Sequence, residues 1–520
     1  MESTSKKPLF SLRELKQYFP VRGKRNTFVK ANDGVSLEIY EGETLGVVGE
    51  SGCGKSTLGR TLLQLYKQTD GETIYYGKSL DSIAPSYALD IYKNLEKKCK
   101  LTKQELVKLQ QMEAEYEKLE AELGKSENKE QLKTLYAKLN EKNEFRKRVM
   151  NNYLAIVRLV GGFYEAKNYS KVSAALVDYY KTTLTIREIN ERIDIMNLEI
   201  AESAYSNGED SPKVLALKSK LESLQNKELK DAENKRVQKQ AVVDAIRAEY
   251  ANDEDFQKYE AMRDDGVNLA LLQYNEMRHL RNEMQLIFQD PYSSLNPRFT
   301  VGQIIAEGCI THKQFKTNNA RAQEYSMEVM EDCGLASYMI HRYPHQFSGG
   351  QRQRIGIARA LSVKPKFVVC DEAVSALDVS IQSQIINLLQ TLKEKENLTY
   401  MFISHDLSVV KYISDRIAVM YLGNIVELAS SEKMFEKPLH PYTEALLSAI
   451  PTTDVEEKAE MIMLEGDIPS PINPPKGCKF NTRCHYVMDI CKQVIPEFAE
   501  IEPNHFVACH RYDDEVANIT

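Results

Sequence analysis

The spacing of hydrophobic and polar positions divides the chain into regions of different character. Short apolar runs at Val35–Tyr40, Leu45–Val48 and Glu72–Tyr76 predict strands within residues 1–80. Apolar runs alternate with helical patterns in residues 281–430, which is typical of a parallel sheet covered by helices. We therefore expect these two regions to fold together as one α/β unit, although 200 residues separate them.

The intervening residues 81–280 follow a different period. They contain only two prolines, Pro85 and Pro212, and are rich in Lys, Glu, Leu, Asn and Gln. Apolar residues recur at alternating steps of three and four in two stretches: Leu109, Met112, Tyr116, Leu119 and Leu123, and Ile186, Ile189, Ile193, Met196 and Ile200. This spacing places one narrow apolar seam along each helix, which predicts an inserted, coiled-coil-like helical region. Residues 431–520 form a last region, rich in proline and containing a group of cysteines.

Composition and charge exclude several kinds of protein. Of the 520 residues, 28% are charged and 42% are hydrophobic, as in an ordinary globular protein. The net charge of −7 gives no basic footprint for nucleic acid, and no run approaches the roughly 18–20 apolar residues that cross a bilayer. The first ten residues lack the apolar core of a secretory signal. A role at a membrane would therefore depend on a partner.

A phosphate-binding loop follows the predicted strand Leu45–Val48. The pattern is carried by Gly49, Glu50, Ser51, Gly52, Cys53, Gly54, Lys55 and Ser56, with Thr57 next in the expected helix. Glycines allow backbone N–H groups to turn toward phosphate oxygens, and the following helix adds its positive N-terminal end. Lys55 supplies charge to the outer phosphates and the Ser56 hydroxyl can ligate magnesium. The motif predicts a nucleotide site.

A second motif strengthens this prediction. The apolar run Phe367–Cys370 predicts a buried strand that ends in Asp371 and Glu372. Asp371 is suited to hold magnesium, and Glu372 is the candidate that positions or polarises the attacking water. Apolar strands often end in acidic residues, so the motif gains its meaning from the phosphate-binding loop upstream.

The segment Phe347–Gln351, followed by RQRIGIARAL, resembles the signature motif of the ABC transporter ATPases. Small residues at a helix N-terminus let phosphate approach closely. Through this resemblance, Gln289 corresponds to the Q-loop glutamine, Ser375–Asp378 to the D-loop and His405 to the switch histidine. The resemblance implies that Gln289 joins Ser56 and Asp371 around magnesium, and that Glu372, His405 and Gln289 form the catalytic group.

The same resemblance implies a fold and an assembly. The expected fold has a RecA-like core, an antiparallel β subdomain and a helical signature subdomain. Phe19 is expected against adenine, with Tyr18 as the neighbouring candidate. Two ATPase subunits of this family sandwich two nucleotides, each completing the other's site with its signature and D-loop. The contributing residues here would be Ser348, Gly349, Gly350, Gln351 and Asp378. Ala373 stands where the family commonly has proline, but Glu372 is retained, so we expect hydrolysis.

Longer phrases narrow the resemblance to the oligopeptide and dipeptide permease ATPases. These phrases are FQDPYSSLNPRFTVGQII, HDLSVVKYISDRIAVMYLGNIVE and HPYTEALLSAIP, and the likeness covers residues 8–80 and 281–512. The SLNPR and LLSAIP forms are most similar to the F-type subunit. This implies a non-identical D-type ATPase partner, two transmembrane permease subunits and an external peptide-binding protein. It also implies a place on the cytoplasmic face of the cell membrane and no nucleic-acid partner. Peptide length, or a preference for nickel or another small solute, is left open.

The C-terminal cysteines form a separate candidate site. Of nine cysteines, Cys478, Cys484, Cys491 and Cys509 lie within 32 residues. Four clustered thiols in a cytosolic chain favour metal binding over disulfides. A 4Fe-4S cluster takes four thiolates at varied spacing and is associated with members of the permease family. Zinc, which prefers closer ligand pairs, and unligated cysteines stay as alternatives. His485 and His510 are expected to be bystanders.

Two further questions have competing answers. Residues 81–280 could be a solvated helical hairpin or a docking surface for a partner, the membrane face or a regulator. The alternative to a transporter is a chromosome-maintenance or DNA-repair ATPase, whose coiled coil lies between the Q-loop and the signature. Here the helical region precedes Gln289, and only 58 residues separate Gln289 from Ser348. The position of the insertion therefore favours a transporter ATPase.

Overall fold

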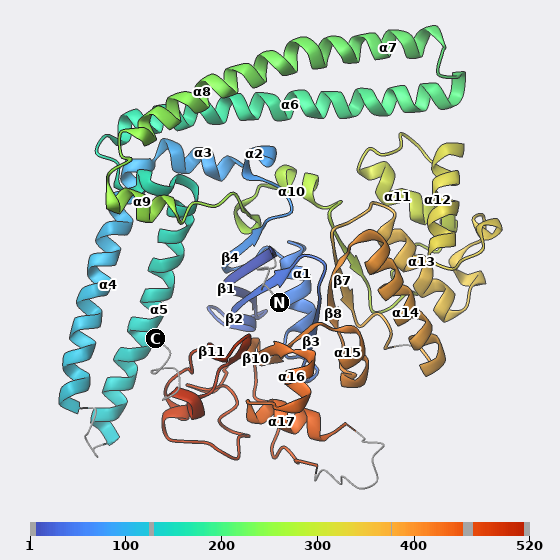
Figure 1. The fold of residues 1–520 in the computed structure, drawn as a ribbon. Helices are drawn as coiled ribbons and strands as arrows, with labels where there is room; N and C mark the ends of the chain where they lie inside the picture. The colour runs from blue at the N-terminus through green and yellow to red at the C-terminus, as the bar shows by residue number, and fades with distance from the viewer. Residues whose placement is uncertain (1–6, 124–128, 376, 451–460, 514–520) are drawn as a thin grey trace.

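The protein is described by a computed structural model that covers residues 7–123, 129–375, 377–450 and 461–513 (Figure 1). The larger of its two sheets has the strand order β11-β12-β10-β9-β3-β8-β7-β6. Its parallel part contains β3 (Thr44–Val48), β6 (Met284–Ile287), β7 (Phe367–Asp371), β8 (Thr399–Ile403) and β9 (Arg416–Tyr421). Antiparallel pairing adds β10 (Asn424–Ser430), β12 (His505–Val507) and β11 (Ala499–Glu502) at one edge. The C-terminal region thus extends the same sheet.

The second sheet is antiparallel, with the order β2-β1-β4-β5. Its strands are β1 (Pro8–Pro20), β2 (Phe28–Tyr40), β4 (Asp70–Tyr75) and β5 (Val267–Asn268). Helix α1 (Lys55–Leu62) joins the two sheets, because Leu58 and Leu62 share one apolar core with Phe10 of β1 and Val369 of β7. The predicted strands Val35–Tyr40 and Leu45–Val48 are confirmed within β2 and β3, and Glu72–Tyr75 lies in β4, with Tyr76 directly after it.

A helical lobe packs on the face of the parallel strands opposite α1. It contains α11 (Val301–Thr311), α12 (Ala320–Asp332), α13 (Gly349–Leu361) and α14 (Val379–Glu396). Its buried residues, such as Ile304, Ile355 and Leu389, belong to the same core as Val368 of β7 and Phe402 of β8. Helices α15 (Leu407–Ile413), α16 (Ser431–Glu436) and α17 (Pro441–Ser448) follow β8 and β10. In Figure 1 this lobe lies to the right of the sheets.

The region between the two halves of the α/β unit is helical, as predicted. It contains α2 (Leu80–Ile83), α3 (Ser86–Lys93), α4 (Leu95–Leu123), α5 (Lys129–Val160), α6 (Tyr169–Asn207), α7 (Pro212–Ser223), α8 (Lys230–Ala248) and α9 (Glu254–Glu260). Helix α4 pairs with α5, and α6 pairs with α7 and α8, which a π-helical turn at Leu224–Leu229 connects (Figure 1). Among the heptad positions, Ile186, Ile189 and Ile193 are buried against Leu224 and Ala232. The side chain of Leu123 lies outside the described residues, and coiled-coil supercoiling stays a prediction.

The inserted helical region, called the helical excursion below, leaves the α/β unit and returns to it at neighbouring positions. The backbone N–H of Leu80 donates to the carbonyl of Asp265 at 2.9 Å. Directly afterwards β5 pairs with β4, and α10 (Tyr274–Leu280) places Met277 and Leu280 in the core that holds α1. We therefore infer that the excursion comprises residues 81–264, and that residues 267–280 belong to the α/β unit rather than to the insertion expected over residues 81–280.

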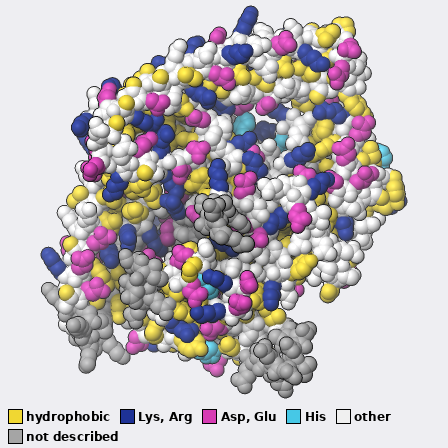
Figure 2. Space-filling view, in the orientation of Figure 1, with side chains coloured by type: hydrophobic (Ala, Val, Ile, Leu, Met, Phe, Trp, Pro, Cys, Tyr) yellow, Lys and Arg dark blue, Asp and Glu magenta, His cyan; other side chains and the backbone are white. Residues whose placement is uncertain are grey.

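Helices α5 and α6 of the excursion also contact other parts of the chain. Helix α6 reaches α12, where Glu202 accepts hydrogen bonds from Asn319 and, at 3.2 Å, from Arg321. Helix α5 runs beside β1, where Lys147 pairs with Glu14 at 3.1 Å. The visible face of the molecule carries interspersed basic and acidic side chains over these helices (Figure 2). Within the part of the chain that the structure describes, no helix is long and apolar enough to cross a membrane.

Candidate nucleotide site

The phosphate-binding loop connects β3 to α1, as expected for a nucleotide site. A side chain at Gly49 is excluded, because a Cβ there would lie 2.2 Å from the carbonyl oxygen of Met420, and the residue has φ +149°. Gly52 also has positive φ, at +79°, but faces open space, while Ser51 is exposed. Gly54 precedes the first helical residue, Lys55, and Ser56 and Thr57 continue the first turn of α1. Ser51 and Gly52, at the crest of the loop, are thus accessible to a ligand, whereas Gly49 packs against the sheet.

The buried lysine of the loop is held by backbone oxygens. Lys55 is 5% exposed, and its Nζ donates to the carbonyls of Gly49 at 2.7 Å and Glu50 at 3.0 Å. Burial raises the pKa of the nearby Cys53 thiol, although Lys55 opposes that shift. Cys53 is therefore a neutral packing residue of the loop at neutral pH, and Lys55 is its cation.

A pair of oxygens beside the loop suits a divalent cation. Ser56 Oγ donates to Asp371 Oδ1 at 2.5 Å, and Arg60 Nη2 lies 3.2 Å from Asp371 Oδ2. Asp371 ends β7 and is 1% exposed. Hydroxyl and carboxylate oxygens are the ligands that magnesium prefers. Two of the three predicted magnesium ligands, Ser56 and Asp371, are therefore in direct contact although they come from distant parts of the chain.

The three predicted catalytic residues meet at the carboxyl ends of neighbouring strands. Gln289 Nε2 donates to Glu372 Oε2 at 2.6 Å, and His405 Nδ1 lies 3.7 Å from the same oxygen. These residues follow β6, β7 and β8, which are adjacent and parallel. Glu372 has φ +50°, and its N–H donates to the carbonyl of Ile403 at 3.0 Å. A non-glycine residue whose backbone is held in the left-handed region by a neighbouring strand is a candidate for a functional role.

The signature lies elsewhere in the molecule, whereas the D-loop directly follows Glu372, where Ser375 Oγ donates to the Glu372 carbonyl at 3.0 Å. Ser348 caps α13, accepting from Gln351 N at 3.4 Å while Gln351 Oε1 accepts from Ser348 N at 3.1 Å. Gly349 and Gly350 open this helix, and Gly350 packs against Ile381 of α14. Asp378 caps α14, and Ala376 falls outside the described residues. Figure 1 shows α13 and α14 in the helical lobe, apart from α1. One chain therefore does not bring its signature to its own phosphate-binding loop.

The aromatic candidates for adenine lie on β1. The Phe19 ring meets Tyr66 edge-on, with centroids 5.2 Å apart. The hydroxyl of Tyr18 donates to Asp33, where burial would raise the pKa of the Asp33 carboxyl but Lys479 and Tyr18 lower it overall. Nothing in the sequence suggested that Tyr66, which follows α1, would contact Phe19, the candidate for binding adenine.

Two C-terminal residues contact the phosphate-binding loop, and sequence reasoning missed both. Arg483 forms a double hydrogen bond with the Glu50 carboxylate, at 2.7 and 3.0 Å. The Tyr442 hydroxyl accepts from Glu50 N at 2.8 Å. Because 433 residues separate Arg483 from Glu50, no local pattern could reveal the pair.

The four C-terminal cysteines lie near one another. Cys478 N donates to the carbonyl of Cys491 at 2.8 Å. Burial raises the pKa of Cys478 to about 12 and that of Cys509 to about 11, and the neighbouring thiols, including Cys484, add to both shifts. Over the described residues, no three or more His, Cys, Asp or Glu side chains are arranged to hold a metal ion. His510, which was expected to be a bystander, forms hydrogen bonds with the Asp513 carboxylate and with the carbonyl of Val494.

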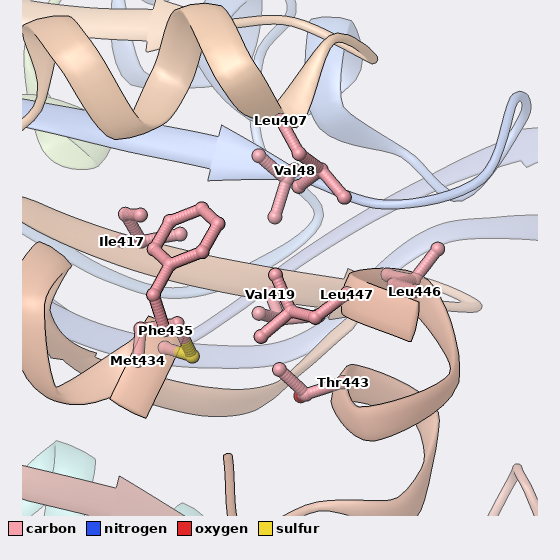
Figure 3. A pocket seen from close by; sticks show the side chains of 9 residues that line it. All are labelled: Val48, Leu407, Ile417, Val419, Met434, Phe435, Thr443, Leu446 and Leu447. Carbon is pink, nitrogen blue, oxygen red and sulfur yellow. The ribbon is translucent and has the colours of Figure 1, made fainter. Parts of the chain in front are cut away.

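A small cavity lies beside the loop but is lined almost wholly by apolar side chains (Figure 3). It is enclosed by Val48, Leu407, Ile417, Val419, Met434, Phe435, Thr443, Leu446 and Leu447. With one hydroxyl and no charged group in its lining, it is a packing void of the core rather than a nucleotide pocket.

Comparison with known proteins identifies the chain's relatives. Residues 32–162 and 244–375 match the family described as "ABC transporter", and residues 426–491 match "Oligopeptide/dipeptide transporter, C-terminal region". The oligopeptide transport ATP-binding protein AppF of Bacillus subtilis is 33% identical over 518 residues, which cover 98% of this chain and 100% of the relative. The putative oligopeptide transport ATP-binding protein YkfD of the same organism is 53% identical over 249 residues, or 48% of this chain and 75% of the relative.

A solved dimeric structure of a bacterial ABC transporter cassette is 15% identical and covers 81% of this chain and 98% of its own, with a TM-score of 0.41. The full-length match to AppF and the two family matches, on a chain whose nucleotide-site residues assemble as described, lead to one conclusion. The chain belongs to the ABC transporter ATPases, in the branch of oligopeptide and dipeptide transport ATP-binding proteins.

Proposed function

We propose that this ATPase is one of two non-identical subunits that power a peptide importer. The observation that carries this is the separation of Ser348 and Gly349, at the start of α13, from the phosphate-binding loop at the start of α1. A nucleotide bound at Lys55 can meet a signature motif only on a second ATPase subunit. By resemblance that subunit is of the D type, and this chain is of the F type.

The proposed assembly includes membrane proteins. Two transmembrane permease subunits and an external peptide-binding protein complete the importer, and this chain binds at the cytoplasmic face of the membrane. Its substrate is an oligopeptide or dipeptide, which the other subunits select. The match of residues 426–491 to the oligopeptide and dipeptide transporter C-terminal region supports this choice of substrate class.

The proposed hydrolysis follows from the geometry around Glu372. Lys55 and the loop amides bind the outer phosphates, and Phe19 contacts the base. Ser56, Asp371 and Gln289 hold magnesium, which neutralises charge on the outer phosphates when bound. Glu372 orients the attacking water, Gln289 fixes the carboxylate from 2.6 Å, and His405 donates to the γ-phosphate. This arrangement works by positioning and charge stabilisation, as phosphoryl transfer requires.

We also propose that Cys478, Cys484, Cys491 and Cys509 bind a 4Fe-4S cluster, with zinc as the alternative. Four thiols that share one small region support the proposal. Anaerobic purification followed by iron, sulfide and zinc analysis tests it, and the absorbance spectrum distinguishes the two metals. Equal metal content in the unmutated protein and in a Cys491→Ser variant would exclude this site.

The test of the main function combines purification with an assay. The tagged protein is isolated from membranes, its partners are identified, and peptide-dependent ATP hydrolysis is compared with a Glu372→Gln variant. We expect a second ATPase and two multi-span subunits, with hydrolysis reduced by about 100-fold or more while ATP binding persists. A homodimer without permease subunits, stimulated by DNA, would overturn the transporter role and leave the ATPase assignment intact.

A further inference from the structure

One segment of the C-terminal region reaches the nucleotide site directly. Arg483 and Lys479 lie between Cys478 and Cys484, and their side chains are only 7% and 13% exposed. Arg483 extends to Glu50 in the phosphate-binding loop. Lys479 donates to Asp33 on β2 and to the carbonyl of Leu422, each at 2.9 Å. These two basic side chains therefore attach one segment to the phosphate-binding loop, to strand β2 and to the turn after β9.

The contact between Arg483 and Glu50 has the geometry of a strong ion pair. Arg483 Nη1 donates to Glu50 Oε2 and Nη2 donates to Oε1, and such double contacts fix orientation as well as charge. The Glu50 backbone is fixed at the same time by the Tyr442 hydroxyl at 2.8 Å. Tyr442 in turn packs against Phe480, three residues before Arg483, with ring centroids 5.4 Å apart. The segment and α17 thus hold one loop residue by both its side chain and its backbone.

The charge of Glu50 gives this contact a consequence for ligand binding. Glu50 is the second residue of a loop that must receive a polyphosphate, so a free carboxylate there would repel the ligand. Arg483 neutralises the carboxylate and turns it toward the C-terminal region. The carbonyl of Glu50 also accepts from Lys55 at 3.0 Å, so movement of Glu50 would disturb the phosphate-binding cation.

We propose that Arg483 is a positioning residue for ATP: it keeps the Glu50 carboxylate away from the phosphates and sets the shape of the loop, which makes the cysteine-containing region part of the nucleotide-binding apparatus. The inference rests on the nucleotide site proposed above. It assigns to the C-terminal region a role in ATP affinity that does not depend on a bound metal.

The test measures the Kd for MgATP on the full-length chain by titration. Arg483→Met leaves a half-buried, unpaired carboxylate beside the phosphates, so we expect ATP binding to weaken by about tenfold. Arg483→Lys keeps the charge without the double contact and is expected to restore part of the affinity. Combining Glu50→Gln with Arg483→Met removes the unpaired charge, so the double variant should bind ATP more tightly than Arg483→Met alone.

A matched control separates this role from general stability. Arg511 lies in the same region and pairs with Glu444 at 3.6 Å, over the ring of Tyr486. Arg511→Met removes an ion pair of the same region that is longer and more exposed than that of Arg483, and it should leave the Kd for MgATP unchanged. Higher salt should narrow the difference between Arg483→Met and the unmutated protein, because ions screen the repulsion. In turnover, the loss should appear in KM for ATP rather than in kcat.

The outcomes are distinguishable. A folded Arg483→Met protein with unchanged affinity for MgATP overturns the inference and leaves the ATPase intact. Equal affinity losses in Arg483→Met and in the double variant, with no salt dependence, also overturn it, because they indicate a purely structural effect. An unmutated chain that does not bind ATP would overturn the proposed nucleotide site as well.

Discussion

Gly49 and Gly52 share a positive φ but differ in what surrounds them. A Cβ at Gly49 would lie 2.2 Å from the Met420 carbonyl oxygen and 2.9 Å from Cys53 Sγ. A Cβ at Gly52 would meet no atom within 4 Å. The two glycines therefore have different roles. Gly49 allows the loop backbone to lie close to β9, and Gly52 leaves the crest of the loop open to a ligand.

Alanine substitutions should separate these effects. Gly49→Ala forces the loop away from β9 and is expected to lower the free energy of unfolding by about 3 kcal/mol or more. Gly52→Ala bears only the backbone penalty of about 1 kcal/mol. Urea denaturation of both variants, monitored by circular dichroism, makes the comparison. Equal losses of stability would contradict the packing argument for Gly49.

Residue by residue, the candidate site was predictable where its members lie in compact motifs. Lys55, Ser56, Asp371 and Glu372 were assigned from sequence, and the structure brings Ser56 to Asp371. Arg483 and Tyr66 could not be assigned, since each gains its place only when distant segments pack together. The roles of Gln289 and His405 came from resemblance and stay predictions, and the structure places both side chains beside Glu372.

At the scale of elements, helix α17 is held by a buried histidine at its start. His440 Nδ1 accepts from Tyr442 N at 3.1 Å, which requires an unprotonated nitrogen. Burial lowers the pKa of His440 to about 4, Glu427 opposes the shift, and Arg511 adds to it. In the unfolded chain the same ring has a pKa near 6.5. The folded state therefore excludes a proton that the unfolded chain takes up.

This difference predicts a loss of stability in acid. Because the folded pKa lies below the unfolded one, the contribution of His440 is complete above about pH 6.5 and declines as the pH falls toward 4. Between pH 7 and pH 5 the loss should be about 2 kcal/mol. Denaturation at both pH values measures it, with His440→Asn as the variant, since asparagine also caps helices. The variant should lose less stability than the unmutated protein over this interval.

Element boundaries show what periodicity could and could not predict. Leu45–Val48 and Val35–Tyr40 were predictable from their apolar residues, whereas β1 (Pro8–Pro20) was not assigned as a strand. The heptad spacing of Ile186, Ile189 and Ile193 gave the correct buried face of α6. The return of the chain to β4 through β5 was missed, because two residues carry no period.

At the scale of the whole molecule, α6 connects the two lobes of the ATPase. Toward its middle, Glu191 Oε1 lies 3.6 Å from His279 Nε2 of α10, which belongs to the nucleotide lobe. Near its end Glu202 binds Asn319 and Arg321, and Tyr205 donates to Glu324 at 2.7 Å. A helix that contacts both lobes restrains the helical lobe, which carries the signature.

Removal of one anchor should loosen the start of α12. Asn319 caps that helix by accepting from Ala322 N at 3.0 Å, and Glu202 holds the other end of the same amide side chain. Glu202→Ala should speed amide exchange at the first turn of α12 by about fivefold. Hydrogen–deuterium exchange with mass spectrometry measures this rate. Glu199→Ala, at an exposed position on the same helix, is the control, and equal exchange in both variants would show that the contact exerts no restraint.

The hydrogen bond between Leu80 and Asp265 has a consequence for how the chain is made. Strand β3 is synthesised early, but the strands on either side of it, β8 and β9, come near the end of translation. The helical excursion has its own buried core, which includes Tyr92, Phe163 and Phe256, and it leaves the ribosome in between. Because domains fold as units from the N-terminus, the excursion can fold first and bring residues 80 and 265 together. When β8 and β9 are synthesised, residues 80 and 265 are then already close together. Pairing of these strands with β3 therefore does not have to close a long free loop, which lowers its entropic cost.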